Sequence, residues 1–400
     1  MSQRIEVTTG PKNADFTGKD HLALQGAVDY VTALGGGTVR ILPGTYEMGN
    51  SLFLRDDIHV VGSGEDTVLH KCPSQATPLV EEMDCYSTHV VVKDGSIFKV
   101  GGAVLVQGKS PFYDKHQYLR RTVTAIEGNT IHIDNDGRLQ DFWLEPQSEA
   151  KTVFSVITGL FVKDAVVENL TIDGNRAENE HFNGCFGAAL FLEDSQRTVI
   201  RNVTARDCNG DGINWQTCED ITVDGCRSIN NADCGLHPGT GNQRPIMTNN
   251  TLIGNKWGLF YCWGVKNGIA ENNVIEEAQQ HGITIGHHDV DNIIRNNQIR
   301  RSGMNGILFR KHPNAARDPH RNVLEQNLIV DSGTKGDCAG IEMLGTAEDV
   351  VLRGNRVVDT RRKHKSRKRI GLRIGPDIKG LQVEDMEFRG MEKDIVDQRR

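Results

Sequence analysis

Side chains suited to acid–base chemistry and to sugar binding recur through the second half of the sequence. Carboxylates can protonate a glycosidic oxygen or activate water, and imidazoles can remove a proton from a carbon. Guanidinium and ammonium groups can bind an acidic sugar, and aromatic faces can stack on a pyranose ring. The residues concerned are Asp211, Asp233, His237, Trp257, Tyr261, His281, His287, Arg310, Lys311 and Glu342. Their clustering predicts a carbohydrate-active enzyme that cleaves glycosidic bonds.

A sequence repeat indicates the elements that would position these residues. A glycine followed by an apolar residue recurs with gaps of 25, 23, 23, 24, 24, 34 and 31 residues, at Gly187, Gly212, Gly235, Gly258, Gly282, Gly306, Gly340 and Gly371. In phase with it runs a ladder of asparagines: Asn250, Asn273, Asn297, Asn327 and Asn355. Coils of short strands stacked about 4.8 Å apart would let equivalent asparagines hydrogen-bond along the stack. We therefore predict an all-β, single-stranded right-handed parallel β-helix.

Three regions are expected along the chain. Residues 1–71 contain a capping helix and the first coils, residues 72–150 a small inserted β-subdomain, and residues 151–400 the main β-helix. The helix is predicted from about Asp20 to Leu34, with one apolar stripe formed by Leu24, Ala27, Val28, Val31 and Leu34. This stretch resembles the N-terminal region of the pectate-lyase-like superfamily, and the resemblance implies that the helix covers the open end of the solenoid.

Four motifs look like the successive active-site motifs of polygalacturonase-type glycosidases. They are NGDGI at 209–213, ADC at 232–234, HGITIG at 281–286 and FRK at 309–311, against NTDG, DDC, GHG and RIK in that family. The resemblance implies that Asp211 and Asp233 activate water and that His281 supports the site. It also implies that Arg310 and Lys311 hold an acidic group of the substrate.

One position departs from that family. Ala232 stands where the family has the carboxylic acid that protonates the leaving oxygen. Inverting hydrolysis needs an acid and a base on opposite sides of the sugar. Another carboxyl, Glu342 or Asp289, would then have to act as the acid. Glycoside hydrolysis is the favoured expectation on this basis.

Two alternative functions stay open at this point. A polysaccharide lyase or C5 epimerase acting on a uronic acid needs a base for the C5 proton and cations beside the carboxylate, but not the acid missing at 232. His237, His281, Lys266 and Arg310 could supply these groups. The second alternative is a β-helix that binds carbohydrate or serves a structural role without catalysis.

Further substrate-binding residues are predicted around the same coils. Trp257, Tyr261 and Trp263 could stack on sugar rings or belong to the core, and Arg244 lies on an expected loop where it could bind a carboxylate or form a surface ion pair. His237, Lys266, His287 and Lys311 complete the predicted binding set. The adjacent histidines of GHHDVDN at 286–292 would point to opposite sides of a strand, so neither a metal nor a cofactor is expected.

Composition narrows the partners and the compartment. The net charge of -7 disfavours nucleic acid, and the basic run at 361–369 is interpreted as a solvated loop. No apolar run approaches the length of a membrane span. The N-terminus lacks a secretory signal, which indicates a cytoplasmic protein, or a secreted one whose signal has been removed. The nine cysteines are expected as reduced thiols. A poly- or oligosaccharide is the expected partner, and homo-oligomerisation stays open.

Overall fold

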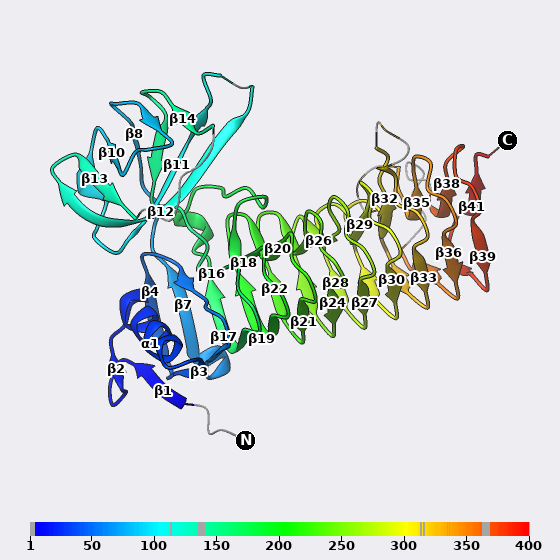
Figure 1. Ribbon diagram of the computed structural model, residues 1–400. Coiled ribbons are helices and arrows are strands. Elements are labelled where there is room, and N and C mark those ends of the chain that lie inside the picture. Colours follow the sequence, from blue (N-terminus) through cyan, green and yellow to red (C-terminus); the bar gives the residue numbers. More distant parts are fainter. Residues whose placement is uncertain are drawn as a thin grey trace.

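The computed structural model shows a long solenoid of stacked coils with a smaller lobe near its N-terminal end (Figure 1). It describes residues 5–112, 114–134, 141–312, 314, 317–333, 335, 337–361 and 369–399. Most of the basic run, residues 362–368, lies outside this range. Strands dominate the described residues, and the predicted parallel β-helix is confirmed. Within the described ranges, no helix combines the length and hydropathy that a membrane crossing requires.

An eleven-stranded parallel sheet forms one face of the solenoid. In spatial order its strands are β5 (Leu52–Phe53), β16 (Ile157–Leu160), β18 (Ala188–Glu193), β20 (Asp211–Gln216), β23 (Cys234–Pro238), β26 (Trp257–Phe260), β29 (Ile283–Ile285), β32 (Ile307–Phe309), β35 (Ala339–Met343), β38 (Ile370–Ile374) and β41 (Lys393–Asp397). Along each strand, alternate side chains enter the core or point outward.

The other faces belong to a 22-stranded sheet with two series of parallel strands. The first series is β1 (Ile5–Gly10), β3 (Gly37–Ile41), β6 (Ile58–Val61), β17 (Val166–Asp173), β19 (Val199–Arg206), β21 (Thr222–Asp224), β24 (Ile246–Thr248), β27 (Ile269–Glu271), β30 (Ile293–Arg295), β33 (Val323–Glu325), β36 (Val351–Arg353) and β39 (Gln382–Glu384). The second is β2 (Phe16–Thr17), β4 (Gly44–Met48), β7 (Thr67–Lys71), β22 (Arg227–Ile229), β25 (Thr251–Ile253), β28 (Val274–Glu276), β31 (Gln298–Arg300), β34 (Leu328–Val330), β37 (Arg356–Val358) and β40 (Glu387–Arg389), joined through the long strands β17 and β19.

Both predicted ladders have physical causes in the structure. A Cβ on Gly258 would lie 2.4 Å from Ile275 Cγ2 and 2.5 Å from the carbonyl oxygen of Gly282 in the next coil, so only glycine fits. In the asparagine ladder, Asn297 Oδ1 accepts hydrogen bonds from the backbone N and from Nδ2 of Asn273, at 3.0 and 2.9 Å. Side-chain amides thus satisfy buried backbone groups at the turns.

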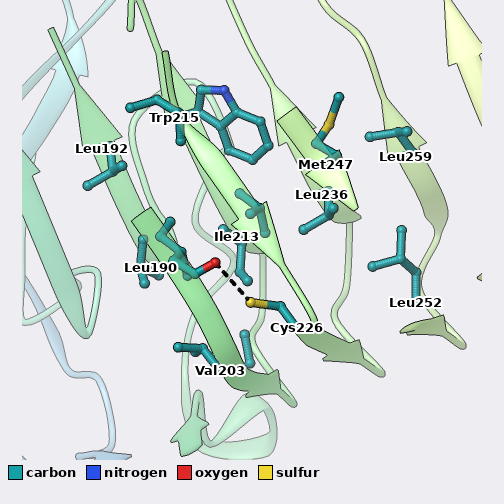
Figure 2. Close-up of a cluster of buried hydrophobic side chains, with 14 of the residues drawn as sticks. Leu190, Leu192, Val203, Ile213, Trp215, Cys226, Leu236, Met247, Leu252 and Leu259 are labelled. Carbon is teal, nitrogen blue, oxygen red and sulfur yellow. Dashed lines mark hydrogen bonds between the residues drawn. The ribbon is translucent and has the colours of Figure 1, made fainter. Parts of the chain in front are cut away.

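The core runs continuously along the inside of the solenoid. Leu190, Ile213, Leu236 and Leu259 occupy equivalent positions in four successive coils, and Trp215 fills the space beside them (Figure 2). All nine cysteines are free, and five are buried: Cys208, Cys218, Cys226, Cys234 and Cys338. Close packing of aliphatic groups and thiols therefore holds the coils in register.

The N-terminal end is covered by α1 (His21–Ala33), whose N-cap Asp20 accepts from the backbone N–H groups of Leu22 and Ala23. The apolar face is buried at Leu24, Ala27, Val28 and Val31. Leu34 was predicted to continue this stripe, but it is 49% exposed. The helix ends at Ala33, and Leu34 is its C-cap residue.

The inserted lobe is antiparallel, unlike the solenoid. Its six-stranded sheet contains β8 (Ala76–Pro78), β10 (His89–Val91), β11 (Ala103–Lys109), β12 (His116–Glu127), β13 (Thr130–Ile133) and β15 (Glu149–Lys151), and β9 (Met83–Asp84) pairs with β14 (Trp143–Leu144). The lobe has a hydrophobic core of its own, and it stands on the same side of the solenoid as the eleven-stranded sheet (Figure 1).

Candidate functional site

Asp211 and His237 form a buried dyad on adjacent strands of the eleven-stranded sheet. His237 Nδ1 lies 2.6 Å from Asp211 Oδ2, and the two side chains are 7% and 1% exposed. The other carboxylate oxygen of Asp211 accepts from the backbone N of Cys234 at 2.7 Å. Asp211 is therefore fully engaged, and it fixes the orientation of the His237 ring.

The hydrogen bonds of Asn214 define the tautomer of His237. Asn214 Nδ2 lies 2.5 Å from the carbonyl oxygen of Gly184, 2.7 Å from Asp211 Oδ2 and 3.0 Å from His237 Nδ1. Its two hydrogens point to the two nearer oxygens, which leaves none for His237 Nδ1. An ionised Asp211 can only accept, so His237 Nδ1 must carry a hydrogen. In the neutral ring, Nε2 then keeps its lone pair, as a general base requires.

A segment of the coil before β18 packs over the dyad. A Cβ on Gly184 would lie 2.1 Å from Asp211 Oδ2, so only a glycine can approach this closely. Gln216 extends the network, because its Nε2 donates to Asn214 Oδ1 at 2.9 Å and its Oε1 accepts from the backbone N of Thr240 at 2.7 Å. The dyad is thus held from several directions before any ligand binds.

Arg310 lies across the outer face of the sheet. Its guanidinium sits 4.1 Å above the ring centroid of Phe260, and its Nη2 donates to the carbonyl oxygen of Tyr261 at 2.5 Å. Gly286 follows β29, the strand between β26 and β32. A Cβ on Gly286 would lie 2.8 Å from Arg310 Nε, so the glycine leaves room for the arginine to reach Phe260 and Tyr261. Burial lowers the pKa of Arg310, but its usual value is high enough that the group stays charged. Arg310 Nη2 also lies 3.7 Å from the buried Asp289 Oδ2, so the guanidinium sits between this carboxyl and the Phe260 ring, which contacts His237 on its other side.

Several buried polar atoms along this stretch have no hydrogen-bond partner among the described residues. On the outer face they include His237 Nε2, Thr284 Oγ1 and Arg310 Nε. Phe260 connects them, since its ring meets that of His237 edge-on at 5.2 Å and it pairs with Thr284 in the next strand. Buried polar groups are normally satisfied, so a row of unsatisfied ones indicates a place where a ligand or water binds.

Asp233 lies one coil beyond Asp211 in a second charged cluster. Its carboxylate accepts from His181 Nε2 at 2.5 Å and from Lys256 Nζ at 3.1 Å. Burial alone would raise the pKa of Asp233, but the hydrogen bonds from His181 and Lys256 outweigh it and lower that pKa. The same bond raises the pKa of His181. Asp233 is therefore a carboxylate of low proton affinity between two cationic partners.

An aromatic group lies beyond the C-terminal ends of the same strands. The rings of Trp263, His287 and His312, from three successive coils, have centroids 5.0 to 6.0 Å apart. Trp263 is 47% exposed, and both Trp263 and His287 have left-handed backbone with φ of 66° and 50°. Burial lowers the pKa of His287 to about 4, so its ring is neutral. This group can present an aromatic surface to a sugar ring.

The inserted lobe closes the face on its N-terminal side. Arg120 of β12 donates to the carbonyl oxygen of Phe186 at 2.7 Å and pairs with Glu193 of β18 at 2.6 Å. Tyr118 stacks on Phe186 with ring centroids 4.1 Å apart. The lobe therefore packs directly against the coil that contains β18, next to the dyad, and borders the eleven-stranded sheet on that side.

Asp211, Cys234 and His237 are also a candidate metal-ligand set, because their donor atoms all lie within 4.8 Å of one another. The 2.6 Å between His237 Nδ1 and Asp211 Oδ2 is shorter than the separation of two ligands around one Zn²⁺ ion, and it matches a hydrogen bond. Burial also raises the pKa of Cys234 well above its ordinary value, which keeps the thiol protonated. The set is better described as a hydrogen-bonded cluster than as a metal site.

Comparison with known proteins identifies the family. Residues 120–264 and 188–357 match the family model described as a right handed beta helix region, together more than half of the chain. The chain belongs to the right-handed β-helix family. No curated protein matches the sequence of this β-helix protein.

Solved structures similar to this β-helix protein have diverse roles. The A-module of the Azotobacter vinelandii mannuronan C-5 epimerase AlgE4 aligns with a TM-score of 0.57 and 14% identity, over 97% of each chain. PfbA, a surface adhesin of Streptococcus pneumoniae, gives a TM-score of 0.59 and 13% identity over 94% of this chain and 89% of its own. ORF18 of Geobacillus virus E2 gives 0.54 and 11%, over 98% and 62%. At these identities the likeness shows the fold alone.

Several predicted site residues lie elsewhere in this β-helix protein. Tyr261 is fully buried, so its predicted stacking on a sugar is wrong. Asp289 is also fully buried and accepts from the backbone N–H groups of Gly264, Val265 and Gly286, so it cannot serve as the missing acid. Arg244 pairs with Asp220 at 2.7 Å on an exposed turn, as expected for a surface ion pair.

Glu342 is too far along the solenoid to partner Asp211 or Asp233. It lies on β35, five strands beyond the β20 of Asp211, which corresponds to about 24 Å at the usual strand spacing. The carboxyl groups of an inverting pair are only about 6.5–9.5 Å apart. Glu342 instead accepts from Asn305 Nδ2 at 2.6 Å and pairs with Arg373 at 2.5 Å. The sequence expectation that Glu342 supplies the acid is therefore wrong.

Of the remaining predicted residues, His281 lies near Arg310 and Trp257 near Phe260, whereas Lys266 and Lys311 lie farther from the dyad. His281 is 8% exposed, and burial together with the charge of Arg310 lowers its pKa to about 4. Its Nδ1 accepts from the backbone N of Asn305 at 3.3 Å, which leaves the hydrogen on Nε2. The ring centroids of Trp257 and Phe260 are 5.2 Å apart, and Lys256 Nζ lies over the Trp257 ring. Lys311 is exposed beyond β32, and Lys266 lies on a turn between coils.

Sequence reasoning missed five residues of the site. Asn214, Gln216 and Phe260 point outward from their strands, and the alternation of buried and outward positions after Gly212 and Gly258 would have indicated them. His181 and Lys256 carried no comparable signal. His181 reaches Asp233 from 52 residues earlier in the chain, a contact that only the fold creates.

Proposed function

We propose that this protein removes the C5 proton of a uronic-acid residue in an acidic polysaccharide, with His237 as the base. The outcome is either β-elimination or C5 epimerisation. The observation that carries the proposal is the Asp211–His237 dyad, whose geometry leaves Nε2 without a hydrogen and without a partner in the part of the chain that the structure describes. A carboxylate-oriented imidazole suits the removal of a proton from carbon, whereas a glycosidase would require a pair of carboxyl groups at this place.

The chemistry requires that negative charge be stabilised as the proton leaves. Removal of the C5 hydrogen moves its electron pair toward the adjacent carboxylate, and a nearby cation lowers the energy of that state. Arg310 is a buried, permanently charged donor with an unpartnered Nε, and it shares the Phe260 ring with His237. In elimination the bond from C4 to its oxygen then breaks, and the leaving oxygen takes up a proton from the protonated His237 or from water. In epimerisation a proton from water returns to C5 on the opposite face, and His237 releases its own proton to solvent.

Substrate entry requires movement over the dyad. His237 is only 7% exposed, and the segment around Gly184 packs over Asp211. A uronate ring can reach Nε2 only after the covering groups shift. The rings of Trp263, His287 and His312 would then bind neighbouring sugars of the chain.

Hydrolysis, the function favoured by the sequence motifs, is less well supported. Asp211 is buried and has both oxygens engaged, so it does not face a water molecule. Ala232, Asp289 and Glu342 cannot provide the carboxylic acid that hydrolysis needs opposite Asp233. The likeness in fold to a mannuronan C-5 epimerase module shows that this architecture can support C5 chemistry, without assigning it to this chain.

The proposal is tested by incubating the protein with a panel of polyuronates and neutral glucans in D₂O. Solvent deuterium at C5, or ultraviolet absorbance from a C4–C5 double bond, is expected with at least one polyuronate and with none of the neutral glucans. His237→Gln should lower the rate by about a hundredfold or more. His89→Gln, which changes a histidine of the inserted lobe, is the matched control and should keep full activity.

Two outcomes would reject the proposal. New reducing ends without unsaturation or C5 deuterium would assign hydrolysis instead. Saturable binding of a polysaccharide with no chemical change, unaffected by His237→Gln, would assign a non-catalytic binding role.

A further inference from the structure

The turns that follow β26, β29 and β32 carry basic side chains near the candidate site. Lys266 lies on the first turn, His288 on the second, and Lys311 and Arg317 on the third. Lys311, Arg317 and His288 are exposed, and Lys266 is half-buried. Within the described residues, Lys266, Lys311 and Arg317 form no ion pair. Their positive charges are therefore available to a ligand.

Other basic residues on the turns of the solenoid are compensated by an acid of the adjacent coil. Arg321, for example, pairs with Asp291 at 2.7 Å. The neighbours of Lys266 along the stack are Gln243 and Val290, and neither carries a charge. The exchange of opposite charges between coils is therefore missing at Lys266.

The basic groups lie close to one another, and the nearby carboxylate of Asp318 is engaged. Burial lowers the pKa of His288, and so do the positive charges of four neighbours: Lys266, His320, Arg321 and Arg317. Charges at a protein surface act in this way only at short range. Asp318 accepts hydrogen bonds from the backbone N of His312 at 2.6 Å and of Thr346 at 2.5 Å. The turns thus present a positive surface to solvent.

This basic surface adjoins the aromatic rings at the ends of the same strands. Lys311 stands between Arg310 and His312 in the chain, and His288 follows His287. Trp263, which is 47% exposed, lies three residues before Lys266. Aromatic faces stack on sugar rings, and cations bind carboxylates. The turns therefore combine the two kinds of group that an acidic sugar requires.

We propose that these turns bind the uronate residues next to the reacting one, so that an acidic polysaccharide crosses the eleven-stranded sheet along its strands. This inference rests on the proposed function, because His237 places the reacting residue. His237 is level with Phe260 on the adjacent strand, three residues before Trp263. Three strand residues span about 10 Å, so a chain that leaves the dyad in the strand direction soon reaches the rings and the basic surface.

A path along the solenoid axis offers less to a polyanion. Beyond Phe260, the equivalent outward positions of the next coils are Thr284, Leu308 and Glu342. Leu308 is apolar, and the carboxylate of Glu342 is paired with Arg373 at 2.5 Å. Neither position supplies an uncompensated cation. In the opposite direction, the inserted lobe borders the sheet.

The test is the equilibrium binding of polymannuronate and polygalacturonate of defined length to the full chain, measured by isothermal titration calorimetry. Every protein carries His237→Gln, so that binding is observed without turnover. The triple variant Lys266→Gln, Lys311→Gln and Arg317→Gln should raise the Kd of the polyuronate that binds by at least tenfold. Its Kd should also depend less on salt, because exposed charges are screened by ions.

A matched control removes three exposed cations from other parts of the molecule. Lys93→Gln, Lys163→Gln and Arg227→Gln together make the same change in net charge. This control should keep the original Kd and its salt dependence. Hydroxyl-radical footprinting with bound polyuronate should protect Trp263 and His288. Circular dichroism of each variant shows whether the fold is retained.

Two results would overturn the inference. One is that neither polyuronate binds the folded protein. The other is a Kd that changes equally in the two triple variants, which would locate the chain elsewhere on the molecule. If a polyuronate is converted by the native chain but binds without these turns, this inference alone fails. If a polyuronate binds through these turns and is not converted, the proposed chemistry alone fails.

Discussion

Replacing Asn297 with alanine tests how the asparagine ladder holds the coils together. The Asn297 side chain makes four hydrogen bonds. Its Oδ1 accepts from the backbone N and Nδ2 of Asn273 at 3.0 and 2.9 Å, and its Nδ2 donates to the carbonyl oxygen of Ala270 at 3.0 Å and to Asn327 Oδ1 at 2.9 Å. At about 1 kcal/mol for each bond, Asn297→Ala should destabilise these coils by about 4 kcal/mol. The backbone N–H of Asn273 would also lose its acceptor.

Hydrogen exchange followed by mass spectrometry is the suitable assay, because solenoid stability is largely a sum over neighbouring coils. Peptides that contain Asn273 and Asn327 should exchange roughly a hundredfold faster or more, and peptides of the inserted lobe should not change. Gln298→Ala is the control, since Gln298 is exposed and accepts only from Arg300 in a side-chain pair. Equal exchange in Asn297→Ala and Gln298→Ala would refute the view that buried side-chain amides stabilise the stack.

Three further predictions concern the site. Gly286→Ala puts a Cβ 2.8 Å from Arg310 Nε and 2.9 Å from Arg310 Cβ, so the arginine must shift and kcat/KM should fall at least tenfold; an unchanged kcat/KM would show that the position of Arg310 does not matter. The pKa of His281 is lowered to about 4, so the native state favours the neutral ring. The contribution of this ring to the free energy of unfolding is fully present above the unfolded pKa near 6.5. It falls by roughly 3 kcal/mol as the pH drops to about 4. Urea unfolding of His281→Gln should show a flatter dependence over this range, and an identical dependence would contradict the assignment. Trp263→Ala should raise KM several-fold with little change in kcat, as expected for a group that binds substrate and transition state alike, and a fall in kcat alone would contradict this role.

The sequence predicted the fold far better than it predicted the site. The glycine ladder encodes a steric constraint at every coil, and Gly258 shows it, because a Cβ there would collide with both the core and the next coil. The asparagine ladder encodes hydrogen bonds that only stacked coils can make. Such constraints repeat, so they are visible as a period without any knowledge of the structure.

Roles of individual residues were harder to predict because exposure and partners depend on distant parts of the chain. Asp211 and His237 were both named, but not as a pair, and their contact joins two coils at 2.6 Å. Tyr261 follows the outward Phe260 and so points inward, where it is fully buried, a direction that depends on the exact start of the strand. Glu342 shares a repeat position with the site but lies about 24 Å along the axis from Asp211.

The sequence by itself determined the coil period, the capping helix and the stretch of coils that carries the reactive side chains. These features follow from local sterics and from hydrogen bonding between neighbouring coils, which a repeat records directly. Only the tertiary structure decided that Gly184 covers the dyad, that His181 pairs with Asp233, and that Arg310 lies over Phe260. Each of these contacts joins residues from different coils, and it depends on side-chain directions and burial that spacing along the chain does not specify.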